Sequence, residues 1–279
     1  MKRIIAYILL FVAVFGITVY LRFPYAEVVR GTLAQKPLPA GIRLEFASLS
    51  PSWLGLSGRQ LVVRQGDRDL LRASRFRVGG LLSTLWGSPR LNTTLDIFGG
   101  RLRMAVSAAE GGRYEVEADG DQLGAGPLLA LLRDGLGEIT GKIDTHLAYT
   151  GIPARWTQGK GEVEVSGGPG QLTGLTLLGQ DVPPIPYDKL RGRLTLDKGF
   201  ARVEKWSLTG PGLSATVDGR LHLRPRLESS ILDLTCQLQL PDPVTTQMAD
   251  LLDLAAQYRQ RDGSYKLRLR GSVGQPRLR

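Results

Sequence analysis

The chain has 279 residues and a formal net charge of +10, with 35 glycines, two histidines and one cysteine. This length can bury a sizeable core, and the recurring Leu, Ile and Val exclude a long disordered chain, while a lone cysteine excludes an internal disulfide. The basic residues are spread singly between apolar ones, which is typical of solvated strand faces and argues against nucleic-acid binding. Contact of these residues with anionic lipid or an acidic partner stays open.

An uncharged apolar run, residues 4–21, begins the chain and lies between Arg3 and Arg22. As a helix it would be about 27 Å long, close to the roughly 30 Å hydrocarbon core of a bilayer. A cleaved signal peptide would have a shorter apolar region and a small-x-small site, which residues 21–25 lack. We therefore expect a retained transmembrane anchor. Its candidate anchor residues are Ile4, Leu9, Phe11, Phe15 and Leu21.

The basic start of the chain favours a cytoplasmic segment of residues 1–3 and places the bulk of the protein outside the cytoplasm. Residues 22–40 then form a linker, in which residues 25–36 could make a short amphipathic helix that Pro37 and Pro39 end. We expect residues 41–279 to be a β-rich periplasmic domain.

From Gly41 onward, apolar and polar residues alternate with a period of two, which predicts strands with one apolar and one wet face. The clearest runs are residues 42–47, 101–106, 113–118, 142–149, 162–166, 193–197, 220–224, 232–240 and 266–270. The tripeptide Gly-Arg-Leu opens a run at Gly100, Gly192 and Gly219, which suggests a weak repeat of hairpin size.

Two stretches with helical spacing interrupt these runs, at residues 126–136 and 243–258. We therefore expect a mainly β fold: a transmembrane helix, then a large curved antiparallel sheet with two or three short helices. The prolines at 183, 184 and 186 offer a place to divide sub-domains, but the similar pattern on both sides favours one continuous domain. Such a sheet could curl over itself, form a sandwich, or hold a helix or an apolar ligand against its apolar face.

Catalytic patterns are absent from the sequence. His146 and His222 lie on the polar phase of their runs, and Cys236 is in phase with neighbouring leucines, as expected of a small buried hydrophobe. These residues do not have zinc-ligand spacing, and residues 135–143 lack the glycine and the hydroxyl residue of a phosphate-binding loop. We expect no enzyme activity, no cofactor and no metal.

Two surfaces are candidates for contact with other molecules. The first is an apolar groove on the long leucine-rich run, formed by Leu232, Leu234, Leu238 and Leu240. The second is a basic face near the end of the chain, formed by Lys266, Arg268 and Arg270. The first would suit lipid, and the second would suit an acidic partner.

The chain resembles the protein N component of bacterial type II secretion systems, in its longer form. The resemblance is spread over the apolar anchor, the leucine-rich middle helix and the repeated Gly-Arg-Leu strands. It also includes the segments Phe23–Pro24, Gly41–Glu45, Pro51–Trp53, Gly55–Gly58 and Asp262–Gly271, with Pro276 close behind. The same rhythm is similar to that of AsmA-like and TamB-like anchored periplasmic proteins, which have a curved sheet with an apolar inner face.

The resemblance implies a non-enzymatic accessory part of a secretion apparatus in the bacterial inner membrane. The implied partners are the membrane itself and other type II secretion components. The alternative is a lipid-binding or lipid-transfer module in the periplasm, with an AsmA-like groove. A hydrolase built on dispersed carboxylates is a residual hypothesis.

Overall fold

The computed structural model describes residues 27, 42–52, 55–66, 68–80, 90–127, 138–174, 176–177, 180–181, 184–240 and 256–278. The expected anchor residues Ile4, Leu9, Phe11, Phe15 and Leu21 lie outside this set, as do most of the linker and of the two expected helices. No helix among the described residues is both long enough and apolar enough to cross a bilayer.

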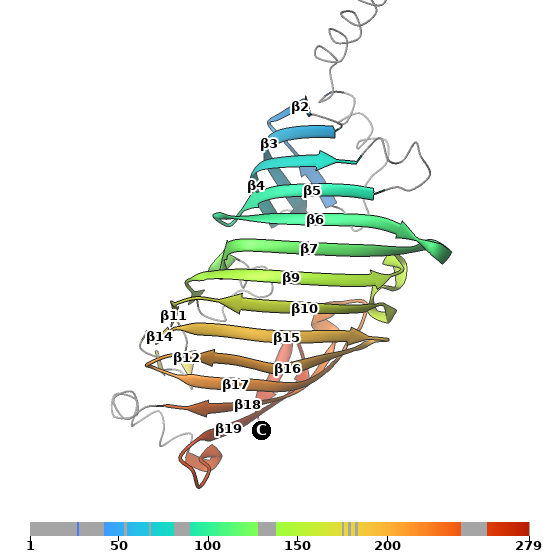
Figure 1. Ribbon diagram of the computed structural model, residues 1–279. Coiled ribbons are helices and arrows are strands. Elements are labelled where there is room, and N and C mark those ends of the chain that lie inside the picture. Colours follow the sequence, from blue (N-terminus) through green and yellow to red (C-terminus); the bar gives the residue numbers. More distant parts are fainter. Residues whose placement is uncertain are drawn as a thin grey trace, which may run out of the picture. The chain divides into compact units, whose positions relative to one another are not determined.

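The fold is mainly β, as the alternating sequence predicts, and its large antiparallel sheet contains 15 strands (Figure 1). The chain divides into two compact units between Ile97 and Phe98. This boundary is far from the prolines at 183–186, where the sequence offered a division. Each predicted alternating run overlaps a strand. In a strand, a period of two places every apolar side chain of the run on one face, where it can be shielded from water.

The first unit contributes five strands to the large sheet. They are β1 (Ile42–Glu45), β2 (Ser48–Ser52), β3 (Gly55–Gln65), β4 (Arg68–Gly79) and β5 (Arg90–Ile97). Both β1 and β2 pair with β3, and β4 lies between β3 and β5.

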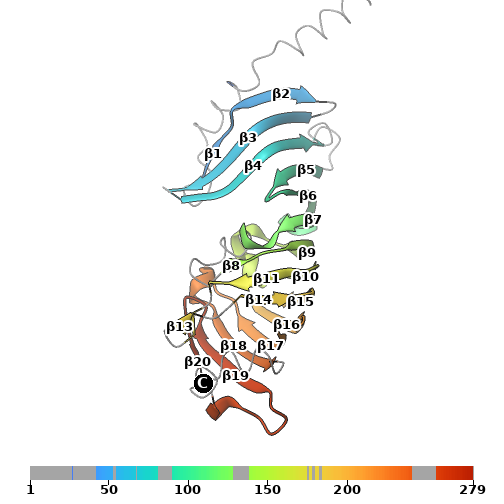
Figure 2. The same ribbon diagram turned by 90° about the vertical axis from the view of Figure 1, so that its left-hand side faces the viewer.

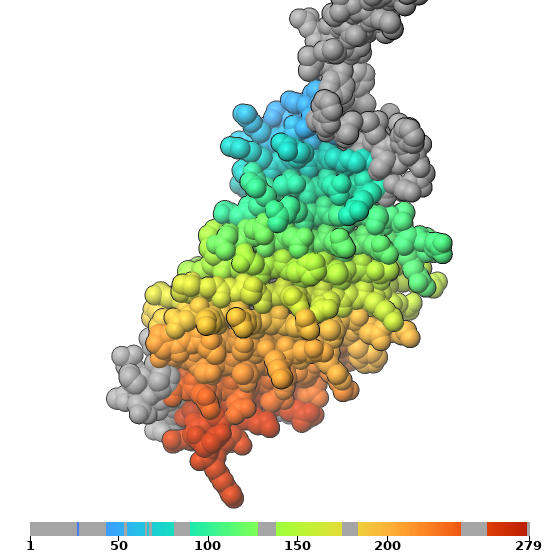
Figure 3. Space-filling view, viewed as in Figure 1, coloured from blue at the N-terminus to red at the C-terminus, as the bar shows by residue number. Residues whose placement is uncertain are grey.

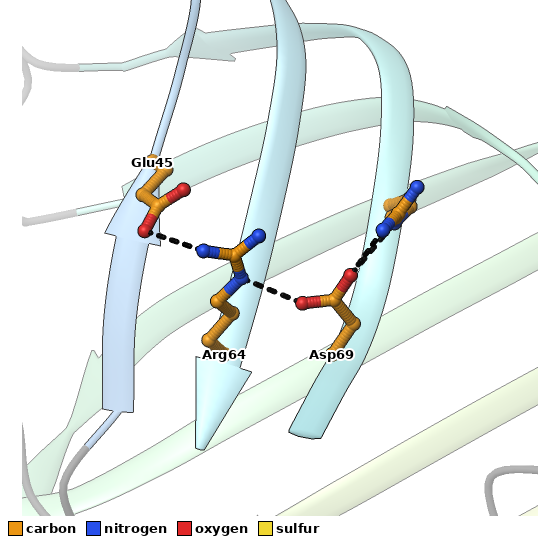
Figure 4. Close-up of polar contacts among 4 residues, drawn as sticks. Glu45, Arg64 and Asp69 are labelled. Carbon is orange, nitrogen blue, oxygen red and sulfur yellow. Dashed lines mark hydrogen bonds and ion pairs between the residues drawn. The ribbon is translucent and has the colours of Figure 1, made fainter. Parts of the chain in front are cut away.

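Charged side chains bridge three of these strands on the wet face. Arg64 on β3 donates from Nη1 to Glu45 on β1 (3.0 Å) and from Nε to Asp69 on β4 (2.7 Å), as Figure 4 shows. Asp69 also accepts from Arg72 Nε at 2.8 Å. The hydrogen bonds with Arg64 and then Arg72 lower the pKa of Asp69 below its ordinary value.

The second unit contributes ten strands to the large sheet. They are β6 (Gly100–Ala109), β7 (Arg113–Gly124), β9 (Lys142–Gly151), β10 (Lys160–Gly167), β15 (Lys189–Asp197), β16 (Phe200–Thr209), β17 (Ser214–His222), β18 (Ile231–Gln239), β19 (Tyr265–Ser272) and β20 (Gln275–Leu278). They pair in this order, each strand antiparallel to the next, and Figure 3 shows their side chains as successive bands.

Short elements complete the second unit. β8 (Glu138–Ile139), β11 (Gly170–Thr173) and β14 (Ile185–Tyr187) make a three-stranded sheet, and β12 (Thr176–Leu177) pairs with β13 (Gln180–Asp181). The described 3-10 helices are η3 (Glu110–Gly112), η4 (Pro153–Gln158), η5 (Leu227–Ser229) and η6 (Ala256–Tyr258). Figure 2 shows the three-stranded sheet on one side of the large sheet, which curls so that β18 and β19 turn toward that side.

One strand of the three-stranded sheet is largely buried. Tyr187 on β14 is 1% exposed, and its hydroxyl donates to the carbonyl of Thr140 at 2.6 Å. Leu123, Ile143 and Ile185 are also buried. Leu123 and Ile143 are opposed residues on the apolar phase of β7 and β9, so this face is covered there.

Glycines inside the strands make room for aromatic rings. A Cβ on Gly192 would lie 2.4 Å from the indole of Trp206 on β16, and one on Gly58 would lie 2.3 Å from the ring of Phe76 on β4. An aromatic ring lying over a glycine on the neighbouring strand covers backbone that the glycine leaves bare. The sequence suggested that the glycine of each Gly-Arg-Leu tripeptide opens a strand. Gly100 does begin β6, but Gly192 and Gly219 lie within β15 and β17, so this prediction is wrong for both.

Candidate functional site

The apolar face of the second unit forms continuous cross-strand rows. Directly opposed residues of antiparallel strands point to the same face, so the register defines each row. One row contains Met104, Ala118, Leu147, Val163, Leu194, Val203, Gly219, Leu234 and Leu269. The next contains Val106, Val116, Tyr149, Gly161, Leu196, Ala201, Leu221, Leu232 and Gly271.

Most residues of these two rows are only half-buried. In the first row only Val203 is buried, and in the second only Ala201 and Leu232 are. Side chains in a close-packed protein core are surrounded on all sides, as Leu123 and Ile143 are at the covered end. Along these two rows most side chains therefore keep part of their surface accessible to solvent, although none of them is among the exposed large apolar side chains.

The candidate groove residues lie on this face. Leu232 is buried, Leu234 and Leu238 are half-buried, and Leu240 is half-buried just beyond the end of β18. Cys236 lies between them, half-buried, and burial raises the pKa of its thiol. A raised pKa disfavours the thiolate, so this cysteine is part of the apolar face and not a ready nucleophile.

The candidate basic face lies on β19, on the side of the sheet opposite to the apolar rows. Two of its three side chains are already paired. Asp233 on β18 accepts from Arg268 Nε at 2.9 Å and from Arg270 Nε at 3.1 Å. The hydrogen bonds of Arg268 and then Arg270 lower the pKa of Asp233 to about 2. Lys266 has no ion-pair partner among the described residues and remains available.

The register shows a wider basic row that the sequence did not reveal. Arg202 lies opposite Arg220, Arg220 opposite Asp233, and Asp233 opposite Arg270, which in turn lies opposite Arg277. The row contains four arginines and one carboxylate, so its net charge is positive. Like charges that lie directly opposite each other repel, and a single carboxylate offsets only part of this repulsion. Strand pairing is needed to find it, because the arginines are far apart in the sequence.

The charged face also has a shallow depression of about 620 Å³ that extends from β6 to β16. In it His146 Nδ1 lies 2.7 Å from Asp119, and this hydrogen bond is the main cause of a raised His146 pKa. Arg193 forms ion pairs with Glu162 and Glu164. Several of the lining charges are therefore paired with each other, which is an arrangement that stabilises neighbouring strands.

Backbone irregularities accompany the depression. Gln122 in β7 and Lys205 in β16 have positive φ angles of 51° and 45°, and the strand register shifts at both places. Such bulges bend a strand and re-aim its side chains. Within the described part of the chain there is no cluster of three or more His, Cys, Asp or Glu side chains that could hold a metal ion.

The fold and these surfaces define a mainly β protein with a large antiparallel sheet, charged on one face and apolar on the other. No family model, curated protein or solved structure matches the chain.

Proposed function

We propose that this protein is a non-enzymatic component of a bacterial type II protein secretion system, acting as a structural and interaction subunit. It is anchored in the inner membrane by residues 4–21, with the bulk of the chain in the periplasm. The resemblance carried by the anchor, the Gly-Arg-Leu strands and the segment Asp262–Gly271 supports this assignment.

The observation that supports an interaction role most directly is the half-buried apolar face of the second unit. Two apolar rows extend over nine strands, and at about 4.8 Å per strand each row is roughly 38 Å long. Apolar surface of this extent is costly to leave in water, and in monomeric proteins it marks contact sites. An interaction subunit would use it to hold a neighbouring protein.

Affinity capture of the full chain from membranes of the source bacterium tests this proposal. We expect other type II secretion components in the captured material and a loss of secretion in a deletion strain. Leu234→Gln, on the apolar face, should reduce capture, while Thr235→Gln, on the opposite face of the same strand, should not. Intact secretion in the deletion strain, together with no secretion component in the capture, would reject the proposal.

A second candidate function is a periplasmic lipid-binding or lipid-transfer module. The same rows support it, because Leu234, Leu238 and Leu269 offer a continuous aliphatic surface for acyl chains. Lipid extraction from the purified protein and labelling with a photoreactive fatty acid would test it. Labels concentrated on the apolar rows support this candidate, and equal labelling of both faces or a lipid-free protein counts against it.

A further inference from the structure

The loops at one end of the second unit form a continuous structure that we call the rim. It consists of the connections β6–β7 (residues 110–112), β9–β10 (residues 152–159), β15–β16 (residues 198–199), β17–β18 (residues 223–230) and β19–β20 (residues 273–274). The first three lie toward the right of Figure 1. Because the strands are antiparallel and paired in order, these connections meet at the same end of the sheet.

Backbone hydrogen bonds join neighbouring loops of the rim. The amide of Lys198 donates to the carbonyl of Gly159 (3.3 Å), and the amide of Leu223 donates to the carbonyl of Gly199 (2.7 Å). At the far end the amide of Gly274 donates to the carbonyl of Glu228 (2.9 Å). These bonds connect the loops from β9–β10 to β19–β20, so this part of the rim is an ordered surface and not a set of independent loops.

Exposed apolar side chains concentrate at the rim. Six large apolar side chains are exposed among the described residues, and Phe200 is the most exposed, at 54%. Leu91 belongs to the first unit. The other five lie in the rim or at the strand ends beside it: Tyr114, Ile152, Phe200, Leu227 and Ile231.

Basic residues surround these apolar side chains. The rim and the adjoining strand ends carry six of them: Arg113, Arg155, Lys160, Lys198, Arg224 and Arg226. The acidic residues of the same segments are Glu110, Asp197 and Glu228. Among the described residues the one ion pair that these basic side chains make is Lys160–Asp197, at 3.9 Å. The rim therefore has excess positive charge that is not neutralised.

Four of the basic residues line one pocket of about 260 Å³ that has no acidic lining residue. Arg113, Arg155, Lys160 and Lys198 surround it, with the exposed side chain of Ile152. Lys198 holds its place at a positive φ of 46°, in a two-residue hairpin turn where Asn, Asp or Gly is preferred.

We propose that the rim docks on an anionic lipid surface, with a phosphate-bearing headgroup in the pocket and Ile152, Phe200 and Leu227 in the interface between headgroups and acyl chains. Isolated apolar side chains separated by Arg and Lys are the pattern of proteins that lie on membranes. An acidic protein is the competing occupant. The lipid surface is favoured because the apolar side chains are dispersed over several loop tips, whereas protein interfaces gather them in a central cluster.

A fluorescent reporter on the rim tests the proposal. In a Cys236→Ser background, Leu227→Cys is labelled with a polarity-sensitive dye, and the full chain is held in phosphatidylcholine nanodiscs. Vesicles that contain phosphatidylglycerol should shift the emission to the blue, and vesicles of phosphatidylcholine alone should not. Leu91→Cys, which places the same dye on the exposed apolar residue of the first unit, should give no shift.

Charge variants complete the test. A basic residue near an anionic membrane contributes about fivefold in affinity, so Arg155→Gln with Lys198→Gln should weaken vesicle binding about 25-fold. Arg191→Gln, within β15 and away from the rim, should leave it unchanged. The proposal is overturned if phosphatidylglycerol causes no shift of the emission. It is overturned too if the double variant and Arg191→Gln bind the vesicles equally well. It is also overturned if polyglutamate shifts the dye and vesicles do not.

Discussion

The packing of Trp206 over Gly192 gives the sharpest test of the strand register in the second unit. A Cβ at Gly192 would lie 2.4 Å from the indole ring, well inside van der Waals contact. Added volume of this kind in a packed site costs about 1–3 kcal/mol. We therefore expect Gly192→Ala to lower the free energy of unfolding by that amount.

Gly168 provides a matched control. A Cβ there would meet nothing within 4 Å, and its φ angle is outside the positive region. Gly168→Ala should leave the free energy of unfolding unchanged or raise it by up to about 1 kcal/mol, because alanine restricts the unfolded chain. A control of the same chemical change separates crowding at Trp206 from the general effect of replacing a glycine.

Urea unfolding followed by circular dichroism measures both variants. With a slope of about 2–3 kcal/mol per molar urea, the midpoint of Gly192→Ala should fall by about 0.3–1.5 M. In a Trp206→Ala background the added Cβ has free space, so the cost of Gly192→Ala should disappear. An equal cost in both backgrounds would show that the ring does not lie over Gly192 and would refute the register of β15 and β16.

Three further predictions concern polar contacts. Tyr187→Phe removes the hydrogen bond to the Thr140 carbonyl in a buried site, and we expect the free energy of unfolding to fall by about 1 kcal/mol in urea titration. The pKa of His146 is raised in the folded state, so its pairing with Asp119 stabilises the protein fully below the unfolded pKa of about 6.5. This contribution is lost as pH rises through the folded pKa. His146→Gln should therefore flatten the dependence of the free energy of unfolding on pH in this range. The pKa of Asp233 is lowered to about 2, so its ion pairs stabilise the protein fully above the unfolded pKa of about 3.9. This stabilisation is lost as pH falls toward 2. In acid titration, the free energy of unfolding of Asp233→Asn should lack this loss.

Strand content was predictable from the sequence because a one-sided sheet imposes a period of two on residue choice. The runs around Leu102, Val163 and Leu267 show this pattern directly, and each lies in a strand. The role of glycine was not predictable in the same way. The tripeptide that begins at Gly192 suggests a glycine that opens a strand. In the structure Gly192 lies within β15 and makes room for the ring of Trp206, which is fourteen residues further along the chain, at the register shift between β15 and β16.

The candidate surfaces were predictable only in part. The phase of Leu232, Leu234 and Leu238 follows from alternation within one strand, so their common face could be derived from the sequence. Their partial exposure could not, because it depends on what covers the sheet. The arginine row and the rim join residues from several strands, such as Arg202 with Arg220 and Lys198 with Gly159, and only pairing order and register bring them together.

We expect the apolar rows of the second unit to bind another molecule. Site-specific photocross-linking in cells of the source organism tests this binding, with a photoreactive phenylalanine in place of Leu234 in one strain and of Thr235 in another. We predict that position 234 gives adducts with a secretion component or with lipid, and that position 235 does not. Equal cross-linking from both positions, or none from position 234, would contradict the claim.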